Sequence, residues 1–358
     1  MKVYETKEIK NIALLGSKGS GKTTLAEAML LECGVIKRRG SVENKNTVSD
    51  YFPVEKEYGY SVFSTVFYAE FLNKKLNVID CPGSDDFVGS AITALNVTDT
   101  GVILIDGQYG VEVGTQNIFR ATEKLQKPVI FAMNQIDGEK ADYDNVLQQM
   151  REIFGNKIVP IQFPISCGPG FNSMIDVLLM KMYSWGPDGG TPTISDIPDE
   201  YMDKAKEMHQ GLVEAAAEND ESLMEKFFDQ GTLSEDEMRS GIRKGLIGRQ
   251  IFPVFCVSAL KDMGVRRMME FLGNVVPFVE DMPAPEDTNG DEVKPDSKGP
   301  LSLFVFKTTV EPHIGEVSYF KVMSGTLNVG EDLTNMNRGG KERIAQIYCV
   351  CGQIKTNV

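Results

Sequence analysis

Short apolar runs alternate with segments of helical spacing over the first 280 residues. The runs typical of buried strands lie at 12–15, 76–80, 102–106, 128–133 and 251–255, and a further strand-like run spans 60–71. Helical spacing follows at 24–31 and 265–272, and residues 107–116 form a loop that leads into another helix. Strands separated by helices form mainly parallel sheets with helices on both faces. The pattern therefore predicts an α/β domain over residues 1–280.

One connection in this domain is too long for a single crossover. Asp137 and Ser258, which both follow predicted strands, are 121 positions apart, whereas a crossover needs far fewer residues. The segment between them contains a strand at 159–165, an amphipathic stretch at 174–183 and helical spacing at 201–218, at 222–228 and after Ser234. We expect an α/β insertion at about 157–250. Its acidic residues are most simply a solvated helix face, and a docking surface is the less favoured interpretation.

The C-terminal part of the chain has a different character. Residues 281–300 are rich in proline and charge, which indicates a linker at a domain boundary. Short predicted strands separated by turns follow at 301–308, 315–322, 325–329 and 343–351. We expect residues 301–358 to be the start of an antiparallel β-barrel. Because the sequence stops directly after a strand, we also expect the barrel to be truncated and the chain incomplete.

Composition narrows the possible partners and compartments. The net charge of −14 argues against binding nucleic acid by bulk attraction, so an RNA contact would need a local patch. The N-terminus lacks the apolar region of a signal peptide, and no apolar run is long enough to span a bilayer. The six cysteines show no metal-ligand spacing and there are only two histidines, so a zinc site is disfavoured. The simplest interpretation of the cysteines is free thiols in a reducing cytoplasm.

A glycine-rich loop between the first strand and the first helix fits the phosphate-binding pattern G-x-x-x-x-G-K-[ST]. The loop and the helix start contain Gly16, Ser17, Lys18, Gly19, Ser20, Gly21, Lys22, Thr23 and Thr24. Glycines let successive N–H groups point at phosphate oxygens, and the helix adds the positive end of its dipole. We predict that Lys22 reaches the β- and γ-phosphates and that the Thr23 hydroxyl holds Mg²⁺. A chance match is the alternative, which the flanking strand and helix disfavour.

A second polar motif follows the strand at 76–80. It contains Asp80, Cys81, Pro82, Gly83 and Ser84. Asp80 would hold Mg²⁺ directly or through water. Gly83 can bring its N–H close to a γ-phosphate because it has no side chain. Alone this motif is a common turn, but its position after a phosphate-binding loop favours a functional role.

A third motif would select the base. It contains Asn134, Gln135, Ile136 and Asp137, directly after the strand at 128–133. An ionised aspartate accepts the guanine N1–H and the exocyclic amine, whereas adenine has no matching donors. Asn134 could serve the other edge of the base or tie this loop to the phosphate-binding loop. A strand-end turn with Asp137 as a helix cap is the alternative.

A later loop supplies further candidate contacts to the base. It contains Ser258, Ala259 and Leu260, between the strand at 251–255 and the helix at 265–272. The N–H groups of Ser258 and Ala259 would contact the guanine oxygen. Residues 33–60 are polar and glycine-containing, and we interpret them as a long mobile loop with a function.

In their order and spacing these motifs resemble elongation factor G, the ribosomal translocase among the translational GTPases. The resemblance covers nearly the whole chain, with matching segments at 16–24, 80–87, 110–116, 134–137, 163–165, 175–181, 244–245, 258–259, 264–265, 306–307 and 315–325. It implies an α/β P-loop NTPase fold, the G domain. The insertion corresponds to the family's G′ subdomain, and the C-terminal strands correspond to the beginning of its domain II.

The resemblance also implies ligands and partners. These are GTP and GDP with Mg²⁺, and for the intact protein the ribosome with its rRNA and proteins. Further ribosome-contacting domains, a cytoplasmic location and a monomeric state are expected, with no membrane or DNA partner. Ser61 keeps a hydroxyl at a position of the family's first switch that holds Mg²⁺, so the expected metal-binding residues are Thr23, Ser61 and Asp80.

The departures from the family pattern concern hydrolysis. Ser84 stands where the family has the histidine that positions the attacking water, and neither His209 nor His313 can be assigned to that role. In the first switch, Tyr58 replaces an arginine and Tyr60 enlarges an apolar position. Two further departures are Gly19 for an aspartate and Gln135 for a lysine.

These observations lead to one main hypothesis and to alternatives. The main hypothesis is a GTP-hydrolysing factor that acts on the ribosome in elongation or translocation, with slow hydrolysis. Its candidate catalytic residues are Lys22, Gly83 and Ser84. The alternatives are a non-hydrolysing, GTP-dependent regulatory clamp on the ribosome and a protein that protects the ribosome against an antibiotic. Asn134 and Asp137 disfavour an ATPase.

Overall fold

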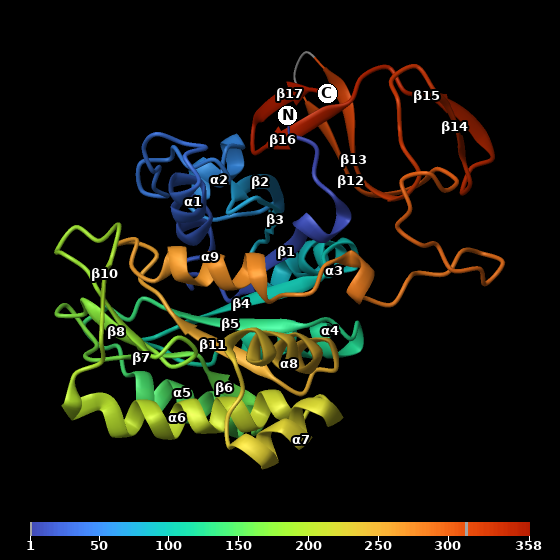
Figure 1. The fold of residues 1–358 in the computed structure, drawn as a ribbon. Helices are drawn as coiled ribbons and strands as arrows, with labels where there is room; N and C mark the ends of the chain where they lie inside the picture. Colours follow the sequence, from blue (N-terminus) through green and yellow to red (C-terminus); the bar gives the residue numbers. More distant parts are fainter. Residues whose placement is uncertain (1, 312–313) are drawn as a thin grey trace.

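A seven-stranded sheet forms the centre of the protein in this computed structural model, which describes residues 2–311 and 314–358 (Figure 1). The strand order is β2-β3-β1-β4-β5-β11-β6, and every neighbouring pair is parallel except β2 and β3. The strands are β1 (Ile9–Gly16), β2 (Thr65–Phe71), β3 (Lys74–Asp80), β4 (Thr100–Asp106), β5 (Val129–Asn134), β6 (Ile158–Pro160) and β11 (Phe252–Cys256). The predicted α/β domain with a mainly parallel sheet is confirmed.

Helices cover both faces of this sheet. The chain moves one way along the sheet after β1 and the other way after β3, and right-handed crossovers in opposite directions lie on opposite faces. Accordingly, α1 packs with α9 against β2 and β3, while α3 packs with α4 against β1. The helices are α1 (Lys22–Glu32), α2 (Pro53–Tyr58), α3 (Val88–Val97), α4 (Val113–Lys124), α5 (Tyr143–Phe154) and α9 (Val265–Asn274). Short 3₁₀ turns occupy Thr6–Glu8, Asp85–Phe87 and Val279–Asp281.

The core is apolar on both faces of the central strands. All seven residues of β4 are buried, which is why this strand reads as a continuous apolar run rather than as an alternating one. On one side, the rings of Phe119, Phe131, Phe154 and Phe252 lie 4.6 to 6.4 Å from their neighbours in the cluster. This cluster joins α4, β5, α5 and β11, and so fixes the end of the sheet from which the insertion leaves.

The insertion contains its own antiparallel sheet and three helices, at the bottom of Figure 1. Its sheet has the order β10-β9-β8-β7. The elements are β7 (Gln162–Pro164), β8 (Ser173–Asp176), β9 (Lys181–Ser184), β10 (Thr193–Ser195), α6 (Asp199–Ala217), α7 (Glu221–Gln230) and α8 (Glu235–Ile247). The three predicted helices are therefore present, and the capping box at Ser234 begins α8.

The single strand predicted at 159–165 is wrong, because the chain changes sheets there. Residues up to Pro160 pair with β11 in the central sheet, and β7 pairs with β8 in the second sheet. Proline has no N–H with which to extend a ladder. The amphipathic stretch at 174–183 forms two strands, β8 and β9, which are joined through Met180 in the left-handed conformation (φ 51°).

The C-terminal residues form three antiparallel pairs. The strands are β12 (Ser302–Glu311), β13 (Gly315–Ser324), β14 (Asp332–Asn335), β15 (Gly340–Arg343), β16 (Tyr348–Cys351) and β17 (Ile354–Asn357). The strand predicted at 325–329 is wrong, because Gly325 has a φ of 77° and packs against the Leu301 backbone in a turn. The single strand predicted at 343–351 is also wrong. Strand β15 ends at Arg343, the first residue of the predicted strand, and β16 covers only its last four residues.

These C-terminal strands pack against the central domain beside β2 and α3 (Figure 1). Lys307 donates to the carbonyl of Ser64, just before β2. The N–H of Gly352 donates to the carbonyl of Val66 within β2, at 2.9 Å. Lys321 donates to the carbonyl at the end of α3, at 2.9 Å. The segment that leads into β2 is therefore held from the C-terminal side as well as by its own sheet.

The proline-rich segment and the helices can be described from the same fold. Between the 3₁₀ turn at Val279–Asp281 and β12, the chain has an isolated bridge from Glu286 to Glu292 and no helix or strand. In the parts of the chain that are described, no helix combines the length and apolar character that a bilayer crossing requires.

A buried ion pair joins the insertion to α9. Arg267 Nε donates to Asp176 Oδ2 at 2.8 Å, and both side chains are almost fully buried. Asp176 also accepts from the Gln162 amide and from the N–H groups of Leu178 and Leu179. Every oxygen of this carboxylate is therefore hydrogen-bonded, as a buried charge requires.

We expect Arg267→Met to destabilise the protein by about 3–5 kcal/mol, because it leaves the Asp176 charge buried without its partner. The measurement is urea unfolding followed by the fluorescence of Trp185, the only tryptophan in the sequence. The matched control is Arg266→Met. The Arg266 side chain is 43% exposed and pairs with Glu32. That change should cost less than about 1 kcal/mol. Equal effects of the two substitutions would contradict the assigned role of the buried pair.

Candidate nucleotide-binding site

The glycine-rich loop connects the end of β1 to the start of α1. The loop glycines Gly16, Gly19 and Gly21 have φ values of 135°, 87° and 90°. A Cβ on Gly21 would lie 2.2 Å from Asn134 Nδ2, so both conformation and space require glycine there. Because α1 begins at Lys22, the first turn of the helix points its free N–H groups into the loop. This is the geometry of an anion-binding site.

Lys22 lies inside this loop with its ammonium turned toward the backbone. Its Nζ donates to the carbonyls of Gly16 at 3.0 Å and Ser17 at 2.8 Å. Burial lowers the pKa of Lys22, and the nearby Asp80 partly opposes that change. A Cβ on Gly83 would lie 2.3 Å from Lys22 Nζ. The structure thus brings Lys22 and Gly83, which are distant in sequence, into direct proximity.

The three residues predicted to hold a metal ion lie together. Thr23 Oγ1 donates to Asp80 Oδ2 at 3.0 Å and lies 3.2 Å from Ser61 Oγ. Burial, reinforced by the neighbouring Asp50 charge, raises the pKa of Asp80 to about 7. The Asp80 Oδ1 atom is buried and has no hydrogen-bond partner within the described residues. A carboxylate held in this way calls for a positive partner.

Asp50 is a functional candidate that the sequence pattern missed. It is 5% exposed, and no well-formed hydrogen bond reaches either of its carboxylate oxygens within the described residues. Burial raises its pKa, while Ser61 and Lys22 lower it. No local signal marks this residue, because it lies in a polar stretch that resembles an exposed loop. Only its burial beside Asp80 distinguishes it.

The residues present at this point fit Mg²⁺. The donor set consists of the Thr23 and Ser61 hydroxyls and the carboxylates of Asp80 and Asp50, all hard oxygen donors of the kind that Mg²⁺ prefers. Mg²⁺ sites typically use one or two carboxylates and leave other positions to phosphate and water. No group of three or more His, Cys, Asp or Glu residues that could hold a metal ion occurs among the described residues.

Two buried glutamates hold the segment that carries Asp50 and Ser61. Glu27 on α1 accepts from the N–H groups of Gly40 at 2.7 Å and Val48 at 2.5 Å. Glu55 on α2 accepts from the N–H of Val62 and of the following residue, both at 3.0 Å. Interpreting residues 33–60 as a loop without regular structure is wrong, because α2 lies within it. The helix begins at Pro53, and the Glu55 carboxylate accepts from the N–H of Phe52 at 3.2 Å.

Asn134 connects three loops. Its Nδ2 donates to the carbonyl of Ser20 in the glycine-rich loop, and its Oδ1 accepts from the N–H of Ala259, both at 2.9 Å. Gln135 adds a hydrogen bond to the carbonyl of Gly19 at 2.7 Å. Of the two roles open to Asn134, tying the loops together is therefore the one that the structure shows. Ile136, within this loop, is buried.

Asp137, the residue predicted to recognise the base, has a charged neighbour. Its Oδ2 lies 3.6 Å from Lys261 Nζ, and its side chain is 12% exposed. The N–H of Ser258 donates to Met263, and that of Ala259 donates to Asn134. Because both of these groups already have acceptors inside the protein, their contact with a guanine oxygen stays a prediction.

Arg39, at the beginning of the segment 33–60, also contacts this loop. Its guanidinium donates to the carbonyls of Ala259 at 2.6 Å and of Leu260. Beside it, burial and the Glu32 charge raise the pKa of Asp262 to about 7. A carboxyl pair therefore lies under the loop that follows β11, with Arg39 as the opposing charge.

The structure places no histidine of the described chain beside the candidate catalytic residue Ser84. The Ser84 hydroxyl donates to Asp86 Oδ2 at 3.3 Å and is partly exposed, whereas Cys81 and Pro82 behind it are buried. His209 lies on α6 in the insertion and bonds through Nδ1 to the carbonyl of Val177 at 2.7 Å. His313 lies outside the described residues. No histidine of the described chain is thus placed at the position of Ser84.

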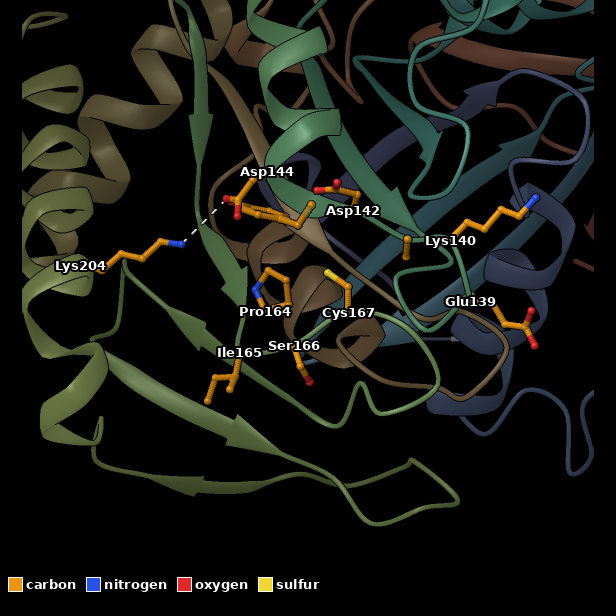
Figure 2. Close-up of a pocket in the computed structure, with 11 residues that line it drawn as sticks. Glu139, Lys140, Asp142, Asp144, Pro164, Ile165, Ser166, Cys167 and Lys204 are labelled. Atoms are coloured by element: carbon orange, nitrogen blue, oxygen red, sulfur yellow. Dashed lines mark ion pairs between the residues drawn. The ribbon is translucent and has the colours of Figure 1, made fainter.

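A separate cleft of about 430 Å³ lies between the loop that begins α5 and the insertion (Figure 2). Lys204 of α6 reaches across it toward Asp144, at 3.9 Å. Its lining consists of Glu139, Lys140, Ala141, Asp142, Tyr143, Asp144, Pro164, Ile165, Ser166, Cys167 and Lys204. Burial raises the pKa of Cys167. None of the predicted phosphate- or metal-binding residues lines this cleft.

The chain is similar to known proteins over nearly its whole length. The family model described as "Elongation factor Tu GTP binding domain" matches residues 7–278, and the model described as "Elongation factor G domain 2" matches residues 300–358. A protein from Thermus thermophilus with a solved crystal structure is similar, with a TM-score of 0.87 and 29% sequence identity. The match covers 98% of this chain and 50% of that chain, so this chain spans half of that protein's length.

The raised pKa of Asp262 predicts a pH-dependent stability. An unfolded aspartate titrates near pH 4, so between about pH 4 and 7 the folded protein binds more protons than the unfolded chain. The stability contributed by protonated Asp262 is therefore lost as the pH rises toward 7. We expect Asp262→Asn to raise the urea midpoint of unfolding at pH 8 and to change it little at pH 5. Asp188→Asn, at an exposed position, should change neither, and a pH-independent effect of Asp262→Asn would contradict the assignment.

Proposed function

The chain belongs to the translational GTPases that share the elongation factor Tu GTP-binding domain, and we propose that it binds GTP and GDP with Mg²⁺ at the loop Gly16–Thr23. We further propose that the intact protein hydrolyses GTP slowly and acts on the ribosome in elongation or translocation, as a monomer in the cytoplasm. The supporting observation is the convergence of Lys22, Thr23 and Asp80 with the base-recognition loop at one edge of the sheet.

The proposed binding mode follows from groups whose present partners in the protein a nucleotide could replace. Phosphate oxygens would take the place of the Gly16 and Ser17 carbonyls as acceptors for the Lys22 ammonium. When bound, Mg²⁺ would supply positive charge next to the phosphates, held by Thr23, Ser61 and Asp80 directly or through water. Asp137 would accept the guanine N1–H and amine in place of its contact with Lys261.

Hydrolysis would proceed in line. The oxygen of a water molecule forms a bond to the γ-phosphorus while the bond from that phosphorus to the β–γ bridging oxygen breaks. The products are GDP and inorganic phosphate, and the proton lost by the water goes to phosphate or solvent. Lys22 and the N–H groups of the loop, with Gly83 at the γ end, would stabilise the charge on the transferred group.

The proposal of slow GTP turnover rests on Ser84, which stands at the position of the family's water-positioning histidine. A serine hydroxyl is too weakly basic to replace an imidazole, and Ser84 is bonded to Asp86. Loss of a residue that positions or activates the nucleophile typically costs about 10²–10⁴ in rate.

A second candidate function is a clamp that uses GTP to fix a conformation. It is favoured by two hydrogen bonds to the C-terminal part of the chain. Lys307 donates to the carbonyl of Ser64, just before β2, and the N–H of Gly352 donates to the carbonyl of Val66, within β2. A γ-phosphate that orders the segment 33–64 would then also fix the position of the C-terminal strands, and hydrolysis would be incidental.

We expect Asp137→Asn to lower GDP affinity about 100-fold and to improve xanthosine diphosphate binding. The asparagine amide offers a donor to the xanthine O2 and leaves the guanine donors unpaired. Isothermal titration calorimetry with both nucleotides in Mg²⁺ buffer measures the change. The control is Asp144→Asn, at an exposed carboxylate on α5. Unchanged GDP affinity in Asp137→Asn would show that the base assignment is wrong.

We expect Ser84→His to raise ribosome-stimulated GTP turnover about 100-fold, since an imidazole can position the attacking water. Phosphate release by the full-length gene product is measured with and without ribosomes. Ser90→His on α3 adds a histidine nearby and should leave turnover unchanged.

If the natural protein is strongly stimulated by ribosomes and Ser84→His adds nothing, another group positions the water and slow hydrolysis is refuted. If ribosomes barely stimulate the natural protein and the histidine variant gains activity, the clamp is supported.

A further inference from the structure

Lys18 carries a side chain that the phosphate-binding pattern does not require. It is the second of the four variable residues between Gly16 and Gly21, and its three companions, Ser17, Gly19 and Ser20, are small. The side chain of Lys18 is exposed, whereas Ser17 and Ser20 are buried. It forms no ion pair with a carboxylate in the part of the chain that the structure describes. An unpaired cation is therefore presented on the outer side of this loop.

The backbone places Lys18 at the γ end of the loop. A Cβ on Gly83 would lie 2.7 Å from the backbone nitrogen of Lys18 and 2.3 Å from Lys22 Nζ. The opposite end of the loop packs on the base-recognition loop, where a Cβ on Gly21 would lie 2.2 Å from Asn134 Nδ2. The loop thus has a base end and a γ end, and Lys18 belongs to the latter.

An aromatic ring holds the Lys18 ammonium at this place. Its Nζ lies 3.6 Å from the centroid of the Tyr60 ring, well inside the range of a cation–π contact. Tyr60 directly precedes Ser61, whose hydroxyl lies 3.2 Å from Thr23 Oγ1. The segment that reaches the metal-binding hydroxyls therefore also restricts the rotamers of Lys18, so less side-chain entropy is lost when the ammonium meets an anion.

The negative charges at this end of the site favour an additional cation when a triphosphate is bound. Asp50 and Asp80 are both buried there, and the whole chain carries a net charge of −14. GTP brings more negative charge to the γ end than GDP does. The bound Mg²⁺ and Lys22 act on the β- and γ-phosphates together, so neither selects strongly for the γ group.

We propose that Lys18, positioned by the Tyr60 ring, contacts the γ-phosphate and makes this site prefer GTP over GDP. This inference rests on the proposed function, because it assumes that the loop binds guanine nucleotides. Lys18 touches the ligand, and Tyr60 is a positioning residue that acts through it. The contact is a charge-assisted hydrogen bond at a partly exposed position, which corresponds to about a tenfold gain in affinity.

The test compares the affinities for GDP and for β,γ-imido-GTP, which is not hydrolysed, by titration calorimetry in Mg²⁺ buffer. We expect Lys18→Met to weaken binding of the triphosphate analogue about tenfold and to leave GDP within about twofold. The control Lys37→Met removes one exposed positive charge from the segment after α1 and should change neither affinity. The loss in Lys18→Met should shrink at high salt, because the contact is partly exposed.

Tyr60 variants separate positioning from fold maintenance. Tyr60→Phe keeps the ring and should bind as the natural protein does. Tyr60→Leu should weaken only the triphosphate analogue, by about threefold. Adding Tyr60→Leu to Lys18→Met should cause no further loss, because the ring acts through the ammonium.

Three outcomes would overturn the inference: unchanged analogue affinity in Lys18→Met, equal losses for GDP and the analogue, or additive effects of the two substitutions. In each of these the natural protein still binds guanine nucleotides, so the proposed function stands. If the natural protein binds neither nucleotide, the proposed function fails, and this inference fails with it.

Discussion

The two hydrogen bonds of the Asn134 side chain are the constraint on which the candidate site depends. One joins the end of β5 to the glycine-rich loop through Ser20, and the other joins it to the loop after β11 through Ala259. Because the amide is buried, loss of either bond would leave a polar group unsatisfied. The absence of a Cβ on Gly21 is what allows the amide to come this close. The loops proposed to bind phosphate and base are thereby fixed relative to each other.

The site is otherwise built from groups that the protein does not satisfy by itself. Buried carboxylate oxygens of Asp50 and Asp80 lack hydrogen-bond partners within the described residues, and burial raises the pKa of both. Lys22 uses backbone carbonyls as substitute acceptors. Such an arrangement is less stable alone than with a cation and an anion of matching geometry. Much of the free energy of ligand binding at this edge would therefore come from relieving buried, unpaired charge.

The segment between α1 and β2 links this edge to the rest of the molecule. Glu27 and Glu55 accept hydrogen bonds from backbone N–H groups of this segment, and Arg39 donates to a carbonyl of the loop after β11. Its far end is bonded to the C-terminal strands through Ser64. The segment thus contacts both the glycine-rich loop and strands that lie outside the central sheet. The insertion is held by the Arg267–Asp176 ion pair and by the N–H of Gly168, which donates to the carbonyl of Ile136.

The sequence by itself determined the features that depend on local spacing. The alternation of apolar runs and helices predicted the central sheet, and the glycine-rich loop was identifiable because its residues are contiguous. Tertiary structure alone decided which distant side chains meet. The burial of Asp50, the role of Asn134 and the contact of Lys18 with Tyr60 each depend on residues far apart in the chain. The division of 159–165 between two sheets likewise followed from which backbone groups were available as partners. Sequence periodicity records which residues are buried, but not what they are buried against.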